Sequence, residues 1–252
     1  MNKPNFFYDS KVMWGRCMNI VLKNPEALVQ ATVTPIFLML LFGAVFGNIA
    51  DVGGYNYVDF IVPGIILQAV AQATQYTAIN VSNDMTRGIV DRFRAMPISR
   101  SAVLIGHAAS SVVRNVMTTV VIIGTAFIVG FRPGAGFLEW LIVAGVLFLI
   151  VTAISCIAVL CGLLAKTPEN ASGYMFPLFI LPFISSGFAP TETMHSAIRW
   201  FAEYQPMTPV INSLRALMLN TYPGNDLWVA LAWSIGIIVA AFFAALQIYK
   251  RK

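Results

Sequence analysis

The stretch SNDMTRGIVDRFRAMPISR, residues 82–100, lies between two long apolar runs and decides how the rest of the chain is arranged. It holds four of the sixteen Lys and Arg residues and two of the eleven Asp and Glu residues, in a chain that is 58% hydrophobic and 11% charged. Globular chains carry about 25% charged residues, so this composition indicates a membrane protein. Such a dense cluster of charge is expected at a turn outside the membrane, between two spanning helices.

Six apolar segments follow from the pattern outside this turn. A spanning helix needs about 20 residues, so six spans and their loops use up the 252 residues and leave no soluble catalytic domain. The predicted fold class is an all-α polytopic membrane protein with one transmembrane domain over 1–252. The predicted spans are 27–46, 59–81, 102–129, 140–165, 172–188 and 227–248.

Basic residues are distributed unevenly over the predicted loops. Twelve fall on one side of the membrane, three on the other, and Arg114 lies within a span. The twelve are Lys3, Lys11, Arg16, Lys23, Arg87, Arg92, Arg94, Arg100, Lys166, Lys250, Arg251 and Lys252, and the three are Arg132, Arg199 and Arg215. Cytoplasmic loops carry an excess of Lys and Arg, so both termini are predicted to be cytoplasmic. This topology explains the net positive charge of the chain, so the charge does not require a nucleic-acid partner.

Two further segments are patterned but too polar to span. In 10–23, apolar residues recur at i, i+3, i+4 and i+7, which predicts an amphipathic helix lying on the membrane; an ordinary helix end with basic anchors is the alternative. Segment 191–220 predicts two short helices that dip into the outer leaflet between spans five and six, because bare backbone is not tolerated in lipid.

Within the opening stretch, Ile89, Phe93 and Met96 repeat at i, i+4 and i+7, while the charged residues face elsewhere. This predicts an amphipathic helix over 87–97 that stops before Pro97. A solvated turn would account for the charges but not for the apolar stripe, which favours docking into a groove of another protein.

Polar side chains in the predicted spans are the candidates for a substrate pathway. Gln68, Gln72, Gln75 and Tyr76 share one face of span two, and amides in hydrocarbon need partners. That face points either to a hydrated pathway or to neighbouring helices. Arg114 lies about three turns into span three, and either snorkels to the interface or meets an internal partner or an anionic substrate group.

Several kinds of chemistry have no pattern in the sequence. There is no GxxxxGK[ST] motif for a nucleotide, no metal-ligand spacing and no hydrolase constellation. A proton or sodium carrier is expected to keep an acid near the membrane centre. The acids of the predicted spans lie at span ends or in loops, namely Asp59, Asp84, Asp91, Glu139 and Glu169. The driving force is therefore expected to come from another subunit.

Three motifs together resemble a known family. They are D-F-x-x-P-G at 59–64, G-x-x-(D/E)-R-x-x-x-x-P-(I/V)-S-R at 88–100, and N-P-(L/M)-T-x-x-x-x-x-x-R at 205–215, with Gln205 in place of the usual Asn. With them the whole chain resembles the membrane subunits of type-2 ABC exporters, especially the daunorubicin-resistance-like drug exporters.

The resemblance implies a mechanism and a set of partners. Two permease subunits, a second copy or a paralogue, would pair in a bacterial or archaeal cytoplasmic membrane with two cytoplasmic ATPases that hold ATP and Mg²⁺. This chain would bind no cofactor and would not itself be an enzyme. The residues expected at the ATPase are Arg16, Gly88, Ile89, Asp91, Arg92, Phe93, Met96, Pro97 and Arg100. The residues expected along the substrate pathway, lined mainly by spans one, two and five, are Gln68, Gln72, Gln75, Tyr76, Arg114, Phe176 and Phe183.

The substrate class follows from a missing signature. Polysaccharide-exporting relatives usually carry R-Y-(R/K)-x-S-x-L-G-x-x-W before span one, and 16–27 lacks it. The resemblance therefore favours lipophilic or amphipathic compounds such as drugs, antibiotics, peptides or lipids. The alternatives are a lipid-linked polysaccharide exporter, a membrane interaction or immunity protein without a transport cycle, and a secondary carrier.

Overall fold

The chain folds into a bundle of helices. The computed structural model describes residues 6–47, 54–89 and 100–251, which form nine α-helices, one 3₁₀ turn and no β-strand. The elements are α1 (Phe6–Lys23), α2 (Pro25–Phe46), α3 (Tyr57–Thr86), α5 (Arg100–Val129), α6 (Phe137–Leu164), α7 (Pro168–Ile180), η1 (Thr191–Thr193), α8 (Ser196–Tyr204), α9 (Met207–Met218) and α10 (Asp226–Arg251). The all-α class predicted from the sequence is confirmed.

Five of the helices in the described ranges are long and apolar enough to cross a membrane. They are α2, α3, α5, α6 and α10, and they coincide with five of the six predicted spans to within a few residues at most ends. Helix α1 precedes them as a separate amphipathic element, with Met13 and Cys17 buried and most of its other residues partly or fully exposed.

The predicted span 172–188 differs from the helix that forms there. Helix α7 begins behind Thr167, whose hydroxyl accepts a hydrogen bond from the Asn170 amide at 3.3 Å, and is 13 residues long. After Ile180 the chain continues in turns to residue 188. Pro182 has no N–H to donate to the preceding helical turn, so the α-helix cannot continue regularly through it. The segment is therefore a short helix followed by irregular backbone.

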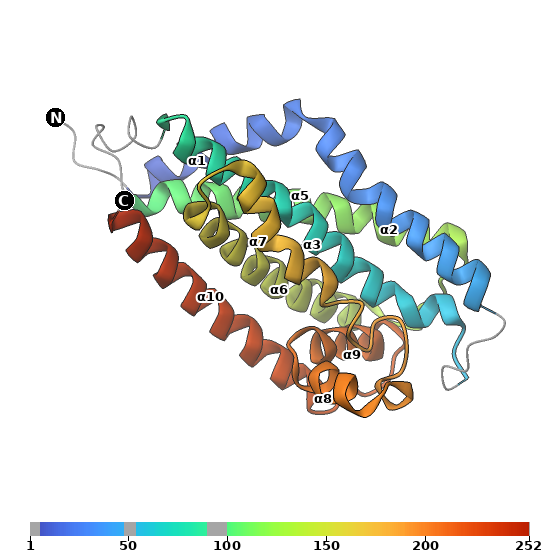
Figure 1. Ribbon diagram of the computed structural model, residues 1–252. Helices are drawn as coiled ribbons and strands as arrows, with labels where there is room; N and C mark the ends of the chain where they lie inside the picture. Colours follow the sequence, from blue (N-terminus) through green and yellow to red (C-terminus); the bar gives the residue numbers. More distant parts are fainter. Residues whose placement is uncertain (1–5, 48–53, 90–99, 252) are drawn as a thin grey trace.

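Helix α3 is the centre of the bundle (Figure 1). It packs against α2, α5, α6, α7 and α9, and most of its residues are buried. Its first turn is capped by Asn56, whose side chain accepts a hydrogen bond from the Val58 amide at 3.2 Å. At Gly64 the helix meets the backbone of Gly187 so closely that an added Cβ would lie 2.7 Å from the Gly187 Cα. The central helix is thereby held against the segment that follows α7.

The two ends of the bundle are built differently. One end holds α1 and the last turn of α10 (Figure 1), and buried residues of five helices form one apolar cluster there. They include Met13, Val81, Val103, Leu163 and Tyr249. The short helices α8 and α9 lie at the opposite end (Figure 1). Helix α1 and the end of α10 thus share one end of the bundle, and its assignment to the cytoplasm rests on the distribution of basic residues.

Candidate coupling and substrate sites

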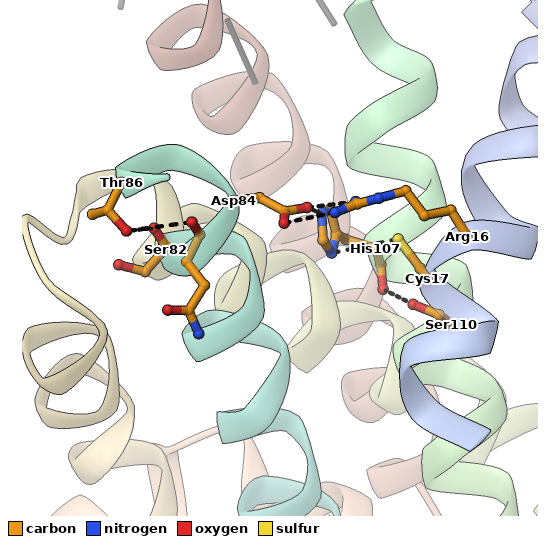
Figure 2. Close-up of polar contacts among 8 residues, drawn as sticks. Arg16, Cys17, Ser82, Asp84, Thr86, His107 and Ser110 are labelled. Carbon is orange, nitrogen blue, oxygen red and sulfur yellow. Dashed lines mark hydrogen bonds and ion pairs between the residues drawn. The ribbon is translucent and has the colours of Figure 1, made fainter. Parts of the chain in front are cut away.

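Asp84 joins three helices at the end of the bundle where α1 lies. The guanidinium of Arg16 donates to both carboxylate oxygens of Asp84, with Nη1–Oδ2 at 2.6 Å and Nη2–Oδ1 at 2.8 Å. The Nε2 atom of His107 lies 3.1 Å from Oδ2 of the same carboxylate. Arg16 comes from α1, Asp84 from α3 and His107 from α5, and their side chains converge in Figure 2.

This Asp84 cluster (Arg16, Asp84, His107) is largely shielded from solvent. Asp84 is 6% exposed and His107 is 4% exposed. Cys17, next to Arg16 on α1, places its Sγ 3.7 Å from Nδ1 of His107 (Figure 2). The hydrogen bonds to Asp84 raise the pKa of Arg16 above its ordinary value. A bidentate Arg–carboxylate pair fixes orientation as well as distance, so α1 is held in one register on α3 and α5.

Close packing supports this attachment of α1. Gly106, one residue before His107, faces the backbone of Met13, and a Cβ there would come within 2.9 Å of the Met13 carbonyl carbon. Met13 and Cys17 are the buried residues of α1 and lie one turn apart. The apolar side of α1 therefore lies on α5, as its amphipathic pattern requires.

Helix α3 ends close to the Asp84 cluster. Gly88 has φ +67° and donates its amide to the Met85 carbonyl at 3.4 Å. A left-handed glycine just after a helix is a common stop. Helix α5 resumes at Arg100. Of the predicted docking residues, Asp91, Arg92, Phe93, Met96 and Pro97 lie outside the described residues, so their docking role stays a prediction.

The predicted pathway residues of α3 connect two other helices. Nε2 of Gln72 donates to the Gln30 carbonyl of α2 at 3.2 Å, and the Tyr76 hydroxyl donates to the Gln30 side chain. On the other side, Gln75 donates to the Ser172 hydroxyl of α7. All three α3 side chains are half-buried. They form a polar face between α2 and α7 that this chain covers only in part.

Gln68 lies apart from this face. It is fully buried, and neither polar atom of its side chain has a hydrogen-bond partner among the described residues. Arg114 is 3% exposed and donates from Nη2 to the Thr77 hydroxyl at 2.6 Å. Its guanidinium is therefore held inside the bundle and does not snorkel to the surface.

Phe183 belongs to a row of aromatic rings that runs from α7 past α2 to the first residue of α3. Neighbouring ring centroids are 4.9 to 6.4 Å apart along the row. In order, this aromatic ladder contains Phe176, Phe179, Phe183, Phe188, Phe42, Phe46 and Tyr57. Phe176 is exposed and Phe183 half-buried, so the ladder leaves ring surface accessible beside the polar face of α3.

The motif that ends at Arg215 ties α9 to the irregular backbone after α7. Nε2 of Gln205 donates to the Ile184 carbonyl at 3.2 Å, and Nη2 of Arg215 donates to the Ser186 carbonyl. Nε of Arg215 also reaches the Phe60 carbonyl of α3 at 3.0 Å. Carbonyls left without a helical partner are costly in an apolar surrounding. The amide of Gln205 meets this need in the place where the family pattern has Asn.

Five apolar helices of spanning length, with a polar face on the central helix α3, are typical of a multi-pass membrane protein. The ABC-2 type transporter family matches residues 8–219. The chain belongs to the ABC-2 type transporter family.

Three relatives illustrate this relationship. The chain is 30% identical over 243 residues, 95% of its length and 85% of the relative's, to a daunorubicin resistance ABC transporter permease protein of Streptomyces coeruleorubidus. It is 26% identical over 229 residues, 89% of its length and 82% of the relative's, to a probable doxorubicin resistance ABC transporter permease protein of Mycobacterium tuberculosis. It is 28% identical over 226 residues, 86% of its length and 84% of the relative's, to an inner membrane transport permease of Escherichia coli.

The sequence-based predictions missed Asp84 and His107 as site residues. Asp84 was interpreted only as a cytoplasmic acid, although it is the acceptor for Arg16, 68 residues away. A usable signal was present on α5, where polar side chains repeat along one buried face at helical spacing. They are His107, Ser111, Arg114, Asn115 and Thr118.

Proposed function

We propose that this chain is the permease subunit of an ATP-driven exporter that moves lipophilic or amphipathic compounds, such as drugs, antibiotics, peptides or lipids, out of the cell. The observation that carries the proposal is the position of the Asp84 cluster. It joins the interface helix α1 to α3 three residues before Arg87, where the predicted docking segment (87–97) begins. Membership of the ABC-2 family and the drug-resistance relatives support the direction and the class of transport.

The proposed partners are two copies of a cytoplasmic ABC ATPase, which hold the ATP and Mg²⁺, and a second permease. The chain carries no P-loop motif of its own. The half-buried polar face of α3 supports a second permease, because a polar face in hydrocarbon requires cover. A second copy or a paralogue facing α2 and α7 would close the pathway. The inner-membrane relative supports a place in the bacterial cytoplasmic membrane.

In the proposed cycle, the ATPases would move α1 and the docking segment together when they close on ATP. The bidentate pair between Arg16 and Asp84 would carry that movement into α3. Because Gln72 and Gln75 of α3 bind α2 and α7, a shift of α3 would change the spacing of the helices along the pathway. Interfaces of this kind switch between discrete arrangements, as alternating access requires.

The test is ATP-dependent uptake by inverted membrane vesicles that hold the chain with its cognate ATPase. Asp84→Asn is expected to lower substrate-stimulated ATP hydrolysis and uptake together, because the carboxylate that binds Arg16 loses its charge. Phe93→Asp should have the same effect by disturbing the predicted docking stripe.

Asp59→Asn is the matched control, because Asp59 lies on the same helix at the other end of the bundle, where it accepts the Arg132 amide at 2.8 Å. It should leave the coupling of hydrolysis to substrate intact. Uptake that is indifferent to ATP would contradict the proposal and favour a protein without a transport cycle. Uptake driven by a proton gradient alone would favour a secondary carrier.

A further inference from the structure

Among the described residues, Arg114 is a buried cation that has no carboxylate as a partner. It lies on α5 about two turns deeper than His107, and one of its nitrogen atoms, Nη2, bonds to Thr77. Its Nε atom has no hydrogen-bond partner in the described part of the chain. No carboxylate of the described residues forms an ion pair with it. An ionised guanidinium in this position is strongly disfavoured unless a counter-charge accompanies it.

The surrounding groups in the described ranges do not supply that counter-charge. Asp84 is already engaged by Arg16 and His107. The ring of Tyr76 lies with its centroid 6.0 Å from the guanidinium carbon, at the limit of a cation–π contact. The Tyr76 hydroxyl is directed to Gln30. Thus one neutral hydroxyl and one distant ring face a full positive charge.

Two small cavities adjoin Arg114 on the side of α1 and α2. One has a volume of about 20 Å³ and is lined by Asn24, Leu28, Tyr76, Asn80 and Arg114, among others. The second, of about 10 Å³, shares Asn80 and Arg114. Such volumes match one oxygen atom or one water molecule. Asn24 is exposed at the junction of α1 and α2, so the larger cavity leads toward the surface there.

We propose that Arg114, assisted by the Asn80 amide, binds the acidic head group of an amphiphile. One phosphate or carboxylate oxygen occupies the cavity beside the guanidinium, and the rest of the molecule leaves past Asn24 at the junction of α1 and α2. An anion accepts a hydrogen bond from Nε and neutralises the buried charge. A water molecule accepts the hydrogen bond but leaves the charge in place. The inference rests on the proposed function, because Arg114 belongs to its substrate pathway, and it narrows the substrate class to acidic amphiphiles.

The test uses the purified chain in a non-ionic detergent without any ATPase. Thermal unfolding is followed while oleoyl lysophosphatidate, oleoyl glycerol or inorganic phosphate is added at matched concentrations. Lysophosphatidate should raise the melting temperature, because a ligand that binds only the folded state stabilises it. Oleoyl glycerol, which has the same chain and no charge, should not. A shift of equal size with inorganic phosphate would overturn the assignment to an amphiphile.

Arg114→Gln should weaken the apparent affinity for lysophosphatidate about tenfold or more, since a charge-assisted hydrogen bond is lost. Arg114→Lys keeps the charge and should retain the shift. Lys23→Gln removes an exposed positive charge at the end of α1 and should leave the shift unchanged.

The ligand-free melting temperature of Arg114→Gln separates binding from folding. It should equal or exceed that of the parent chain, because an unpaired buried charge has been removed. The proposal would be overturned if lysophosphatidate raised the melting temperature of Arg114→Gln as much as that of the parent chain. It would also be overturned if Arg114→Gln and Lys23→Gln reduced this rise equally. Because this binding test contains no ATPase, its outcome does not depend on whether the chain carries out ATP-driven export.

Discussion

Asp84 is the residue on which α1, α3 and α5 converge. Its carboxylate is nearly buried and accepts two short hydrogen bonds from Arg16. A buried ion requires its partner, so removal of Arg16 would leave the Asp84 carboxylate with His107 as its one charged partner among the described residues, and removal of the carboxylate would take away the acceptor of these two Arg16 hydrogen bonds. Arg16 and Asp84 therefore stabilise the fold as a pair, and their interaction should appear as a coupling energy between the two residues.

A double-mutant cycle of Arg16→Gln and Asp84→Asn tests this unit at the residue scale. The two single changes should each lower stability, and the double change should cost less than their sum, with a coupling of about 1–3 kcal/mol. The measurement is the free energy of unfolding of the purified chain in mixed micelles.

The matched control for this cycle is the exposed pair Arg199 and Glu203 of α8, which is equally short at 2.6 Å. Arg199→Gln with Glu203→Gln should show no measurable coupling, because solvent screens exposed pairs. Additive effects at Arg16 and Asp84 would contradict the assigned role of the cluster.

At this scale the sequence predicted which single residues are important, but it did not predict which residues bind each other. Arg16 could be assigned to an interface helix from its periodicity, and Arg114 stood out as the basic residue within a span. Their surroundings could not be predicted, because Asp84 and Thr77 come from another helix whose rotation and depth are set by packing. That no described carboxylate pairs with Arg114 likewise depends on how the helices pack.

At the scale of elements, the close packing of α1 on α5 depends on Gly106, which has no side chain. Gly106 allows the backbones to approach, and Met13 fills the contact. Apolar periodicity predicted each helix separately, because it records which face is buried. It did not predict which helix covers α1. Likewise Pro182, which ends the regular helix, is visible in the sequence, but the partners of the carbonyls that follow could not be predicted, because Gln205 and Arg215 come from a later segment.

Gly106→Ala should weaken the attachment of α1. The added methyl group would lie 2.9 Å from the Met13 backbone, and such overpacking costs about 1–3 kcal/mol. Gly124→Ala on the same helix is the control, because a Cβ there meets nothing within 4 Å. It should be neutral or slightly stabilising. Melting temperatures of the two variants in detergent give the comparison, and equal behaviour would contradict the close approach.

At the scale of the whole molecule, α1 and the end of α10 share one end of the bundle, and α8 and α9 occupy the other (Figure 1). The connection between α6 and α7 belongs with α1, and the connection between α9 and α10 with α8. The number of basic residues predicts which end faces the cytoplasm, and this assignment can be measured directly.

Single-cysteine labelling tests that orientation. In a background without Cys17, Cys156 and Cys161, an impermeant maleimide should label Tyr222→Cys in intact cells, since Tyr222 is 90% exposed at the end of the bundle that is predicted to face outward. Lys166→Cys, exposed between α6 and α7, should react only in inverted vesicles. The reverse pattern would place the Asp84 cluster on the outer side and remove the basis for coupling to a cytoplasmic ATPase.

In the proposed substrate pathway, the aromatic ladder would affect the speed of export. Its rings follow one another at centroid spacings of 4.9 to 6.4 Å, so a flat apolar compound would exchange one stacking partner for a similar one at each step. A pathway conducts well when each stop is favourable enough to enter and shallow enough to leave. A row of similar rings would give such a binding free-energy profile, with many weak binding positions in place of one strong position. It would also tolerate compounds of different outline, because the accessible rings, such as Phe176 and Phe183, offer the same kind of surface to all of them.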